Sequence, residues 1–238
     1  PVRLGVHQGF IFLNLDAAAE PLEQHFADLP DLSRFRMAQL HCGKRIEYSV
    51  EANWKLICEN YSECYHCAAN HPQLSRISES LAPGERGEEI GRCFNGGPMR
   101  MREGIETMSM SGKSTLPPIP GLTADDHRYV HYYVIYPNML LSPHPDYVLT
   151  HTAWPLTPQR TRVVCEWLFT AEAVSQKNFD PADVVEFWDV TNRQDWALCE
   201  RAQAGIASRG YRQGPYQPTE DCVHTLDHWY ADRLAAML

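Results

Sequence analysis

Two histidines, His66 and His71, are the residues of this chain best suited to chemistry, and both lie in segment 53–72, NWKLICENYSECYHCAANHP. On a straight α-helix a step of five residues rotates by about 140°, so the two imidazoles would not face one point. Pro72 disfavours helical backbone at the residue before it, and a helix that ends at about Asn70 would let His71 turn back towards His66. Closely spaced histidines often begin a metal site. The structural alternative is a hydrogen-bonded core His66 and a surface His71 beside a turn.

The expected third ligand is a carboxylate from the other half of the chain. Asp195 lies on the apolar stripe of a helix expected over residues 181–209, where a charge is costly unless it is paired or metal-bound. Asp189 is the competing residue, and Asp195 could instead pair with Arg193 or Arg201, or face water. Two histidines and one carboxylate with open positions form the facial triad of non-haem Fe(II) oxygenases. Zinc held by the same ligands is the chemical rival.

The cysteines do not predict a disulfide scaffold or a complete iron–sulfur site. The chain has 8 Cys among 238 residues, at irregular spacing. Cys64-Tyr65-His66 has the Cys-x-His form of one half of a Rieske cluster site, but no Cys-x-x-His pair follows it. We therefore expect reduced thiols and a cytoplasmic protein.

Composition and charge narrow the classes of protein. Hydrophobic residues are 44% and charged residues 21%, as in ordinary globular proteins, and 238 residues can bury a large core. The net charge of -9 argues against a nucleic-acid partner, which would need clustered cations. No apolar run is long enough to span a membrane, and no signal-peptide pattern is seen. Because the chain begins with Pro1, we suspect a processed form or a piece of a longer protein.

The elements expected around these residues include both strands and helices. The strand-like runs cover residues 2–15 with a break at Gly9, 45–52, 129–141, 147–154 and 162–171. The helical patterns cover residues 21–35, 53–70, 181–209 with Gly210 as its stop, and 224–237. Sequential strands with short links favour an antiparallel meander. Residues 78–128 are irregular and rich in Gly and Pro, and we expect them to form a lid.

The histidine segment resembles the catalytic-domain motif of the α subunits of Rieske-type non-haem iron oxygenases. The matches stand in family order: Asn53-Trp54-Lys55, Glu59-Asn60-Tyr61, Glu63-x-Tyr65-His66 and His71-Pro72. A second match lies in the long helix and after it: Asn192-x-Gln194-Asp195, Glu200, Gln203, Gly205, Ser208, Tyr211 and Gly214-Pro215. The resemblance covers nearly the whole chain. It implies one α+β catalytic domain over residues 1–238, with a helix-grip fold in which a curved antiparallel sheet of about seven strands surrounds the long C-terminal helix.

The resemblance also implies roles for single residues. His66, His71 and Asp195 would bind mononuclear Fe(II). Glu63 stands where the family has an acidic bridge, usually Asp, that carries electrons between an iron-ligand histidine and a Rieske-ligand histidine of the neighbouring subunit. A carboxylate suits this position because it accepts imidazole N–H bonds on both sides. Asn60 matches the family asparagine near the iron. For Glu63 the structural alternative, without the motif, is an exposed acid on a helix.

The Rieske domain that precedes the catalytic domain in this family is absent from the chain. The [2Fe–2S] centre would therefore come from a missing domain or from a separate polypeptide. The resemblance further implies O2 as co-substrate, NAD(P)H oxidised by a separate reductase, and a homotrimer as the assembly.

Glu rather than Asp at position 63, within the string ENYSECYHC, resembles the branch of the family that acts on choline, carnitine and glycine betaine. This implies hydroxylation of an N-methyl group or a neighbouring carbon, with loss of formaldehyde when a methyl is attacked. A quaternary ammonium substrate favours an aromatic cage with nearby acids. The expected contacts are Phe94, Tyr133, Trp154 and Trp188, from a set that also includes Tyr132 and Tyr136. The alternative is that these aromatic residues are plain core packing of a sheet.

Three other functions remain open at this stage. Family members that hydroxylate or dihydroxylate aromatic rings share the same iron site. A zinc hydrolase could use His66, His71 and Asp195 as ligands and Glu63 as base. A helix-grip domain could also bind small molecules without catalysis.

Overall fold

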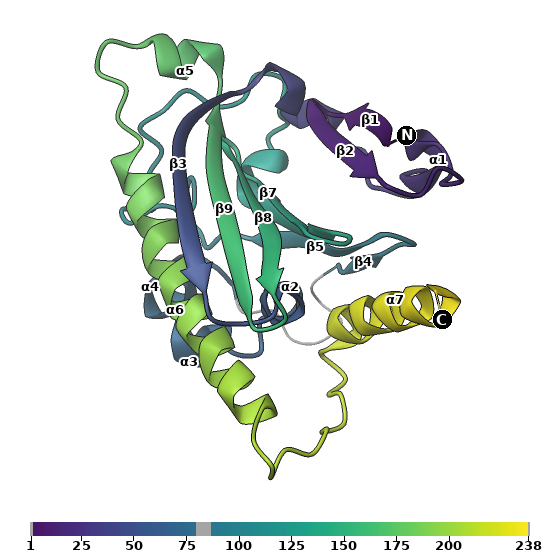
Figure 1. The fold of residues 1–238 in the computed structure, drawn as a ribbon. Helices are drawn as coiled ribbons and strands as arrows, with labels where there is room; N and C mark the ends of the chain where they lie inside the picture. The colour runs from purple at the N-terminus through teal and green to yellow at the C-terminus, as the bar shows by residue number, and fades with distance from the viewer. Residues whose placement is uncertain (1, 80–86, 238) are drawn as a thin grey trace.

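A seven-stranded antiparallel sheet forms the centre of the fold, with strand order β3-β9-β8-β7-β6-β5-β4 (Figure 1). The computed structural model describes residues 2–79 and 87–237. The strands of this sheet are β3 (His41–Val50), β4 (Glu89–Ile90), β5 (Phe94–Arg100), β6 (Tyr129–Ile135), β7 (Met139–Pro143), β8 (Val148–Thr157) and β9 (Arg160–Phe169). A separate hairpin pairs β1 (Arg3–His7) with β2 (Phe10–Asn14). Its turn falls at the expected break, where Gly9 has a φ of 90°.

The long helix α6 (Ala182–Ile206) runs along β3 and β9 (Figure 1). Together with α2 (Trp54–Ser62) it covers one face of the sheet, because apolar side chains recur at helical spacing on both helices. The other helices are α1 (Leu22–His25), α3 (Cys67–Asn70), α4 (Pro72–Ile77), α5 (Ala171–Ser175) and α7 (Asp221–Met237). The expected α+β fold, with an antiparallel sheet and a long helix in the C-terminal part, is confirmed.

The sheet separates two hydrophobic clusters, and β6 contributes to both. Val134 and Tyr132 pack in the cluster beneath α2 and α6, whereas Tyr133 and Ile135 belong to the cluster on the other side. Successive side chains of a strand point to opposite faces, which produces this division. Two neighbouring aromatic residues of β6 therefore lie on opposite faces of the sheet, and only one of them faces α2 and α6.

The expected single helix over residues 53–70 is wrong. Helix α2 ends at Ser62, and Glu63 has extended backbone with φ -134° and ψ 160°. The Glu63 carboxylate accepts hydrogen bonds from the backbone N–H groups of Tyr65 and His66, which compete with continuation of the helix. The proline after His71 begins α4 instead of only following a helix end, because proline suits the first turn of a helix.

Three further expectations are corrected. Residues 129–141 form two strands, β6 and β7. The irregular segment 78–128 contains β5, whose glycines admit a close neighbour: a Cβ atom on Gly96 would lie 1.9 Å from the backbone oxygen of Tyr132. Positions 80–86 of that segment lie outside the described residues, so the lid stays a prediction. Helix α6 ends at Ile206 with Ala207 in right-handed conformation, so Gly210 does not terminate it.

None of the described helices is both long and apolar enough to cross a membrane.

Candidate metal centre

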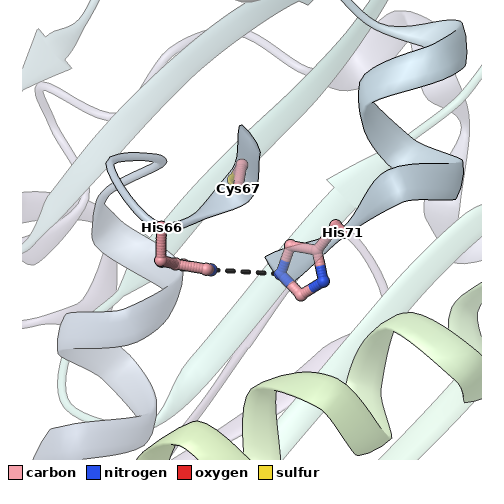
Figure 2. A group of neighbouring side chains, drawn as sticks. All are labelled: His66, Cys67 and His71. Carbon is pink, nitrogen blue, oxygen red and sulfur yellow. Dashed lines mark hydrogen bonds between the residues drawn. The ribbon is translucent and has the colours of Figure 1, made fainter. Parts of the chain in front are cut away.

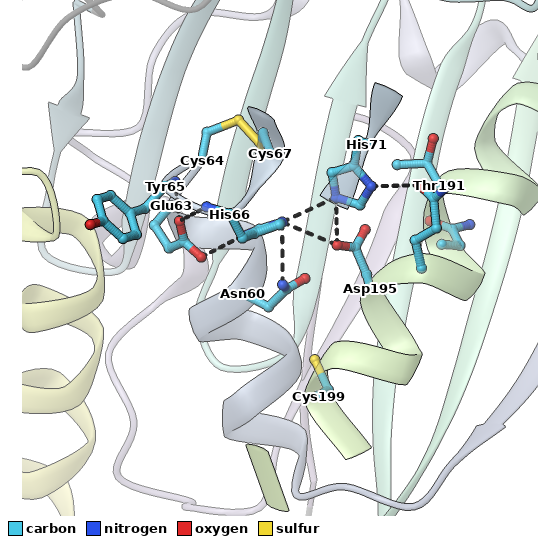
Figure 3. A network of polar contacts seen from close by, with 12 residues as sticks. Asn60, Glu63, Cys64, Tyr65, His66, Cys67, His71, Thr191, Asp195 and Cys199 are labelled. Carbon is cyan, nitrogen blue, oxygen red and sulfur yellow. Dashed lines mark hydrogen bonds and ion pairs between the residues drawn. A yellow bond between two sulfur atoms is a disulfide. The ribbon is translucent and has the colours of Figure 1, made fainter. Parts of the chain in front are cut away.

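Three donor atoms from two distant segments meet at one point (Figure 3). The Nε2 atoms of His66 and His71 are 3.1 Å apart. Oδ1 of Asp195 lies 3.2 Å from Nε2 of His66 and 2.9 Å from Nε2 of His71. The turn after α2 supplies His66, the residue before α4 supplies His71, and α6 supplies the carboxylate. The structure thus brings together the three residues expected to bind a metal.

The second nitrogen of each imidazole is already engaged. Nδ1 of His66 lies 2.5 Å from Oε1 of Glu63, and Nδ1 of His71 lies 2.7 Å from Oε1 of Gln194. Because carboxylate and amide oxygens only accept, both Nδ1 atoms donate. In these tautomers each Nε2 atom presents its lone pair to the other and to Asp195. Three lone pairs this close repel one another unless a cation lies between them.

Without a metal ion, a proton on Nε2 of His66 relieves this repulsion. Burial lowers the pKa of His66, but its hydrogen bonds with Asp195 and Glu63 outweigh burial and raise it to about 9. Burial acts to raise the pKa of Asp195, yet hydrogen bonds from His66 and His71 bring it below its ordinary value. The cluster therefore favours positive charge at its centre, which a proton or a metal ion can provide.

The donor triangle fits a divalent metal. Ligands about 2.1 Å from an ion, on adjacent corners of an octahedron, lie about 3.0 Å from one another. The three edges observed here, 2.9, 3.1 and 3.2 Å, are close to that value. The side chain of His71 is 1% exposed and that of Asp195 is 16% exposed, so the triangle is shielded from bulk water on most sides.

Asp189, the competing carboxylate, lies outside this triangle. It accepts a hydrogen bond from the Tyr48 hydroxyl and pairs with Arg193 on the same helix.

Asn60 lies near the expected metal position: its Nδ2 atom is 3.4 Å from Nε2 of His66. In the described part of the chain Asp195 pairs with neither expected arginine, and its carboxylate instead faces Nε2 of His66 and Nε2 of His71.

Cysteine lies beside the triangle as well. Donor atoms of His66, Cys67 and His71 are all within 4.8 Å of one another (Figure 2). Cys67 forms a disulfide with Cys64, so it offers no thiolate, and Asp195 is the better third ligand. This disulfide contradicts the expectation that all cysteines are reduced. The spacing Cys-x-x-Cys in a turn brings the two Cα atoms to 4.9 Å, within the range for a disulfide.

A pocket of about 140 Å³ opens onto the metal ligands. Four carboxylate residues line it, namely Glu63, Glu79, Glu88 and Asp195. No Lys or Arg is present among its described lining residues. Its aromatic walls are Tyr61, Tyr132 and Trp188, and the ring of Tyr132 lies 6.0 Å from each of the other two. Pockets for drug-sized ligands run to about 300–1,000 Å³, so this one favours a smaller ligand.

Of the four aromatic residues expected to contact substrate, Trp188 lines this pocket. Phe94 and Tyr133 lie in the hydrophobic cluster on the opposite face of the sheet. Trp154 lies in the outer half of β8 and is 46% exposed. Tyr132 lines the pocket instead of Tyr133, its neighbour in sequence.

No role was predicted for Gln194 from the sequence, although this residue belongs to the second sequence match. The structure shows that it orients His71.

The chain is similar in sequence to known proteins. The family model described as "Ring hydroxylating alpha subunit (catalytic domain)" matches residues 37–236. The glycine betaine monooxygenase oxygenase subunit of Pseudomonas aeruginosa is 26% identical over 263 residues, covering 98% of this chain and 61% of the relative. The carnitine monooxygenase oxygenase subunit of Acinetobacter pittii is 25% identical over 218 residues, covering 89% of this chain and 54% of the relative. The chain thus spans a little over half the length of these relatives.

The fold also matches a solved structure. A quaternary ammonium Rieske monooxygenase, studied for carnitine oxidation and inter-subunit electron transfer, superposes with a TM-score of 0.75 at 22% identity. The match covers 98% of this chain and 62% of the solved one. At this identity the similarity shows a shared fold.

Proposed function

Because this chain belongs to the family of ring-hydroxylating α-subunit catalytic domains, we propose that it is the catalytic domain of a Rieske-type mononuclear non-haem iron monooxygenase. Its reaction is the O2-dependent hydroxylation or N-demethylation of a small quaternary ammonium compound. One observation carries the proposal: a triangle of two imidazoles and one carboxylate opens onto a pocket lined by three further acids, with no Lys or Arg among its described residues.

His66, His71 and Asp195 would hold the metal. Bound Fe(II) would supply the reaction of O2 with a substrate C–H bond. The chain's own contribution is positioning: Glu63 and Gln194 fix the two imidazoles so that their Nε2 atoms face the ion. The buried setting of His71 limits the access of water to the reacting centre.

The pocket is suited to a small cation. An ammonium group is attracted to the faces of aromatic rings, and Tyr132 and Trp188 offer such rings beside the metal ligands. The carboxylates of Glu79 and Glu88 add negative potential on the same walls. The relatives named for glycine betaine and carnitine carry this substrate class in their names.

Electrons would enter at Glu63. Its carboxylate contacts His66 on the inner side, and Tyr65, two residues later in the same turn, is 72% exposed, so this turn is open to a partner. The partners are a Rieske [2Fe–2S] domain and a reductase that oxidises NAD(P)H, and we place the reaction in the cytoplasm. A homotrimer would bring the Rieske domain of a neighbouring subunit to this turn.

Metal content and ligand binding test the proposal together. The chain is loaded anaerobically with Fe(II), and the binding of choline is compared by calorimetry with that of 3,3-dimethylbutan-1-ol, its uncharged carbon analogue. We expect one metal ion per chain, and choline bound at least about tenfold more tightly because of cation–π attraction and the acidic pocket. Glycine betaine, carnitine and naphthalene complete the panel.

The other outcomes identify the rival functions. Preference for naphthalene over every ammonium compound would indicate an aromatic-ring oxygenase. Zinc retained on purification, with ester or amide hydrolysis and no O2 uptake, would indicate a hydrolase. Ligand binding that is unchanged in His66→Ala, with no metal in either protein, would indicate a non-catalytic binding domain.

A further inference from the structure

The turn between α2 and α3 contains a chemical group that the proposed reaction does not use. Cys64 and Cys67 form a disulfide there, and both residues line the pocket that holds the metal ligands. The backbone N–H of Cys67 donates to the backbone carbonyl oxygen of Cys64, so the disulfide joins the two ends of one tight turn. The same turn holds the Glu63 carboxylate against Nδ1 of His66.

The disulfide has the features of a redox-active bond. The other cysteines, all in the described part of the chain, form no disulfide: Cys42, Cys58, Cys93, Cys165, Cys199 and Cys222. A single disulfide among reduced thiols is not a scaffold, and Cys-x-x-Cys is the spacing of thiol–disulfide exchange sites. Cys64 and Cys67 are half-buried, and the exposed Tyr65 lies between them, so a dithiol can approach.

Reduction of this disulfide would affect the metal ligands, because Cys67 lies close to them. Its sulfur lies with donor atoms of His66 and His71 inside a group no wider than 4.8 Å (Figure 2). A disulfide sulfur is a poor metal ligand, whereas a thiolate is a strong one that prefers softer metals than a carboxylate does. Breaking the bond would therefore add a thiolate beside the two imidazoles, where it could compete with the carboxylate of Asp195 for the metal.

We propose that Cys64 and Cys67 form a reversible dithiol–disulfide site that controls whether Cys67 can join the metal ligands; this rests on the proposed metal centre. In the oxidised form the ion has two imidazole ligands and one carboxylate ligand. In the reduced form the thiolate of Cys67 competes with Asp195, and the turn that holds Glu63 is no longer closed by a covalent bond.

The chemistry balances with ordinary reagents. A dithiol gives two electrons and two protons: its own S–S bond forms, the Cys64–Cys67 bond breaks, and two thiols result. Hydrogen peroxide reverses the step: the O–O bond breaks, the S–S bond forms, and two waters leave with the two thiol protons. When a metal binds, the thiol proton of Cys67 is released to solvent.

Cobalt(II) reports directly on sulfur ligation, because a cobalt–thiolate bond gives a charge-transfer band in the near ultraviolet. Wild-type chain, oxidised or reduced with dithiothreitol and then freed of it, is loaded anaerobically with Co(II). We expect the band only in the reduced protein. Alkylation before and after reduction, followed by peptide mapping, should label Cys64 and Cys67 only after reduction.

Two variants separate the roles of the sulfurs. Cys64→Ser leaves the Cys67 thiol without its disulfide partner and should show the band without reduction. Cys67→Ser should show no band in either state, which also excludes the nearby Cys199 as the ligand. Far-ultraviolet circular dichroism establishes that both variants are folded.

Two results would overturn the switch alone. One is Co(II) bound by reduced wild type and by Cys64→Ser without a thiolate band, which contradicts the switch but leaves the metal centre intact. The other is alkylation of both cysteines before any reduction. Failure of every form to bind Co(II) would contradict the proposed metal centre itself, and with it the switch.

Discussion

Nδ1 of His71 lies 2.7 Å from Oε1 of Gln194, the residue that precedes the metal-ligand candidate Asp195 on α6. One helix therefore supplies a carboxylate to the site and also orients a neighbouring imidazole. Gln73 donates to the same amide oxygen at 2.9 Å, which holds the Gln194 side chain in place. Orientation of the ligands is thus built into adjacent positions of a rigid element.

Gln194→Ala should weaken metal binding by about 10–100-fold, the usual cost of removing an outer partner of a ligating histidine. The imidazole of His71 would lose the acceptor that fixes its tautomer. Anaerobic titration with Fe(II) or Co(II) measures the change. Gln159→Ala, at an exposed turn, is the matched control, and an equal loss in both variants would contradict the orienting role.

Asp195→Ala should abolish most metal binding, with a loss larger than that of Gln194→Ala, because a direct ligand is removed. Asp189→Asn should retain the metal, since Asp189 contacts Tyr48 and Arg193 and not the imidazoles. Metal analysis of the folded variants distinguishes the two carboxylates. Unchanged iron in Asp195→Ala would contradict the assignment of Asp195 as a metal ligand.

The approach of His66, His71 and Asp195 could be expected from sequence because two kinds of information agree. The motif order places both histidines at the end of a helical segment, and the 3.6-residue period places Asp195 on the buried stripe of a second helix. The antiparallel sheet could be predicted equally well, since strand-like runs follow one another with short links. Periodicity and turn chemistry are local properties that a sequence displays directly.

The aromatic wall of the pocket was harder to predict from sequence, because it depends on which face of β6 points inward. Tyr132 and Tyr133 are adjacent and chemically equal, and only the pairing of β6 with β5 and β7 decides that Tyr132 faces the pocket. The break at Glu63 was hidden for a different reason. Its carboxylate competes with the helix for backbone N–H groups, and helical periodicity does not report that competition.

Glu63→Gln should keep the metal but slow electron delivery when a Rieske partner is present. The amide oxygen of Gln can still accept from Nδ1 of His66, but Gln lacks the negative charge of the bridge, and its NH2 group cannot accept the backbone N–H bonds that Oε2 of Glu63 accepts. Stopped-flow oxidation of a reduced Rieske protein measures the rate. Glu172→Gln, in the exposed first turn of α5, is the control, and an unchanged rate in Glu63→Gln would remove the bridging role.

Glu59 should make the free energy of unfolding depend on pH. Burial, reinforced by the negative charge of Asp227, raises its pKa from 4.5 to about 7. At pH values between 4.5 and about 7 the folded state therefore keeps a proton on Glu59, whereas the unfolded state has released it. The stabilisation is fully present below about pH 4.5 and is lost as the pH rises through about 7. The full effect is about 3 kcal/mol.

Glu59→Gln removes this titration, so the wild type should lose stability relative to the variant between about pH 5 and pH 8. Urea unfolding of the metal-free proteins at both pH values measures the difference. Glu172→Gln should follow the wild type at both. A constant gap between wild type and Glu59→Gln across this range would contradict the assignment to Glu59.

Tyr132→Leu should weaken the binding of tetramethylammonium by about 2–30-fold, which corresponds to the roughly 0.5–2 kcal/mol of a cation–π contact. Tyr132→Phe should bind within about twofold of wild type, because the ring face is kept and this probe accepts no hydrogen bond from the buried, unpartnered Tyr132 hydroxyl. Calorimetry on the metal-loaded protein gives both affinities. Tyr133→Leu, one residue away on the opposite face of β6, should leave affinity unchanged if circular dichroism shows it folded. An equal loss at both positions, or a large loss in Tyr132→Phe, would show that the ring of Tyr132 does not form the wall that meets the cation.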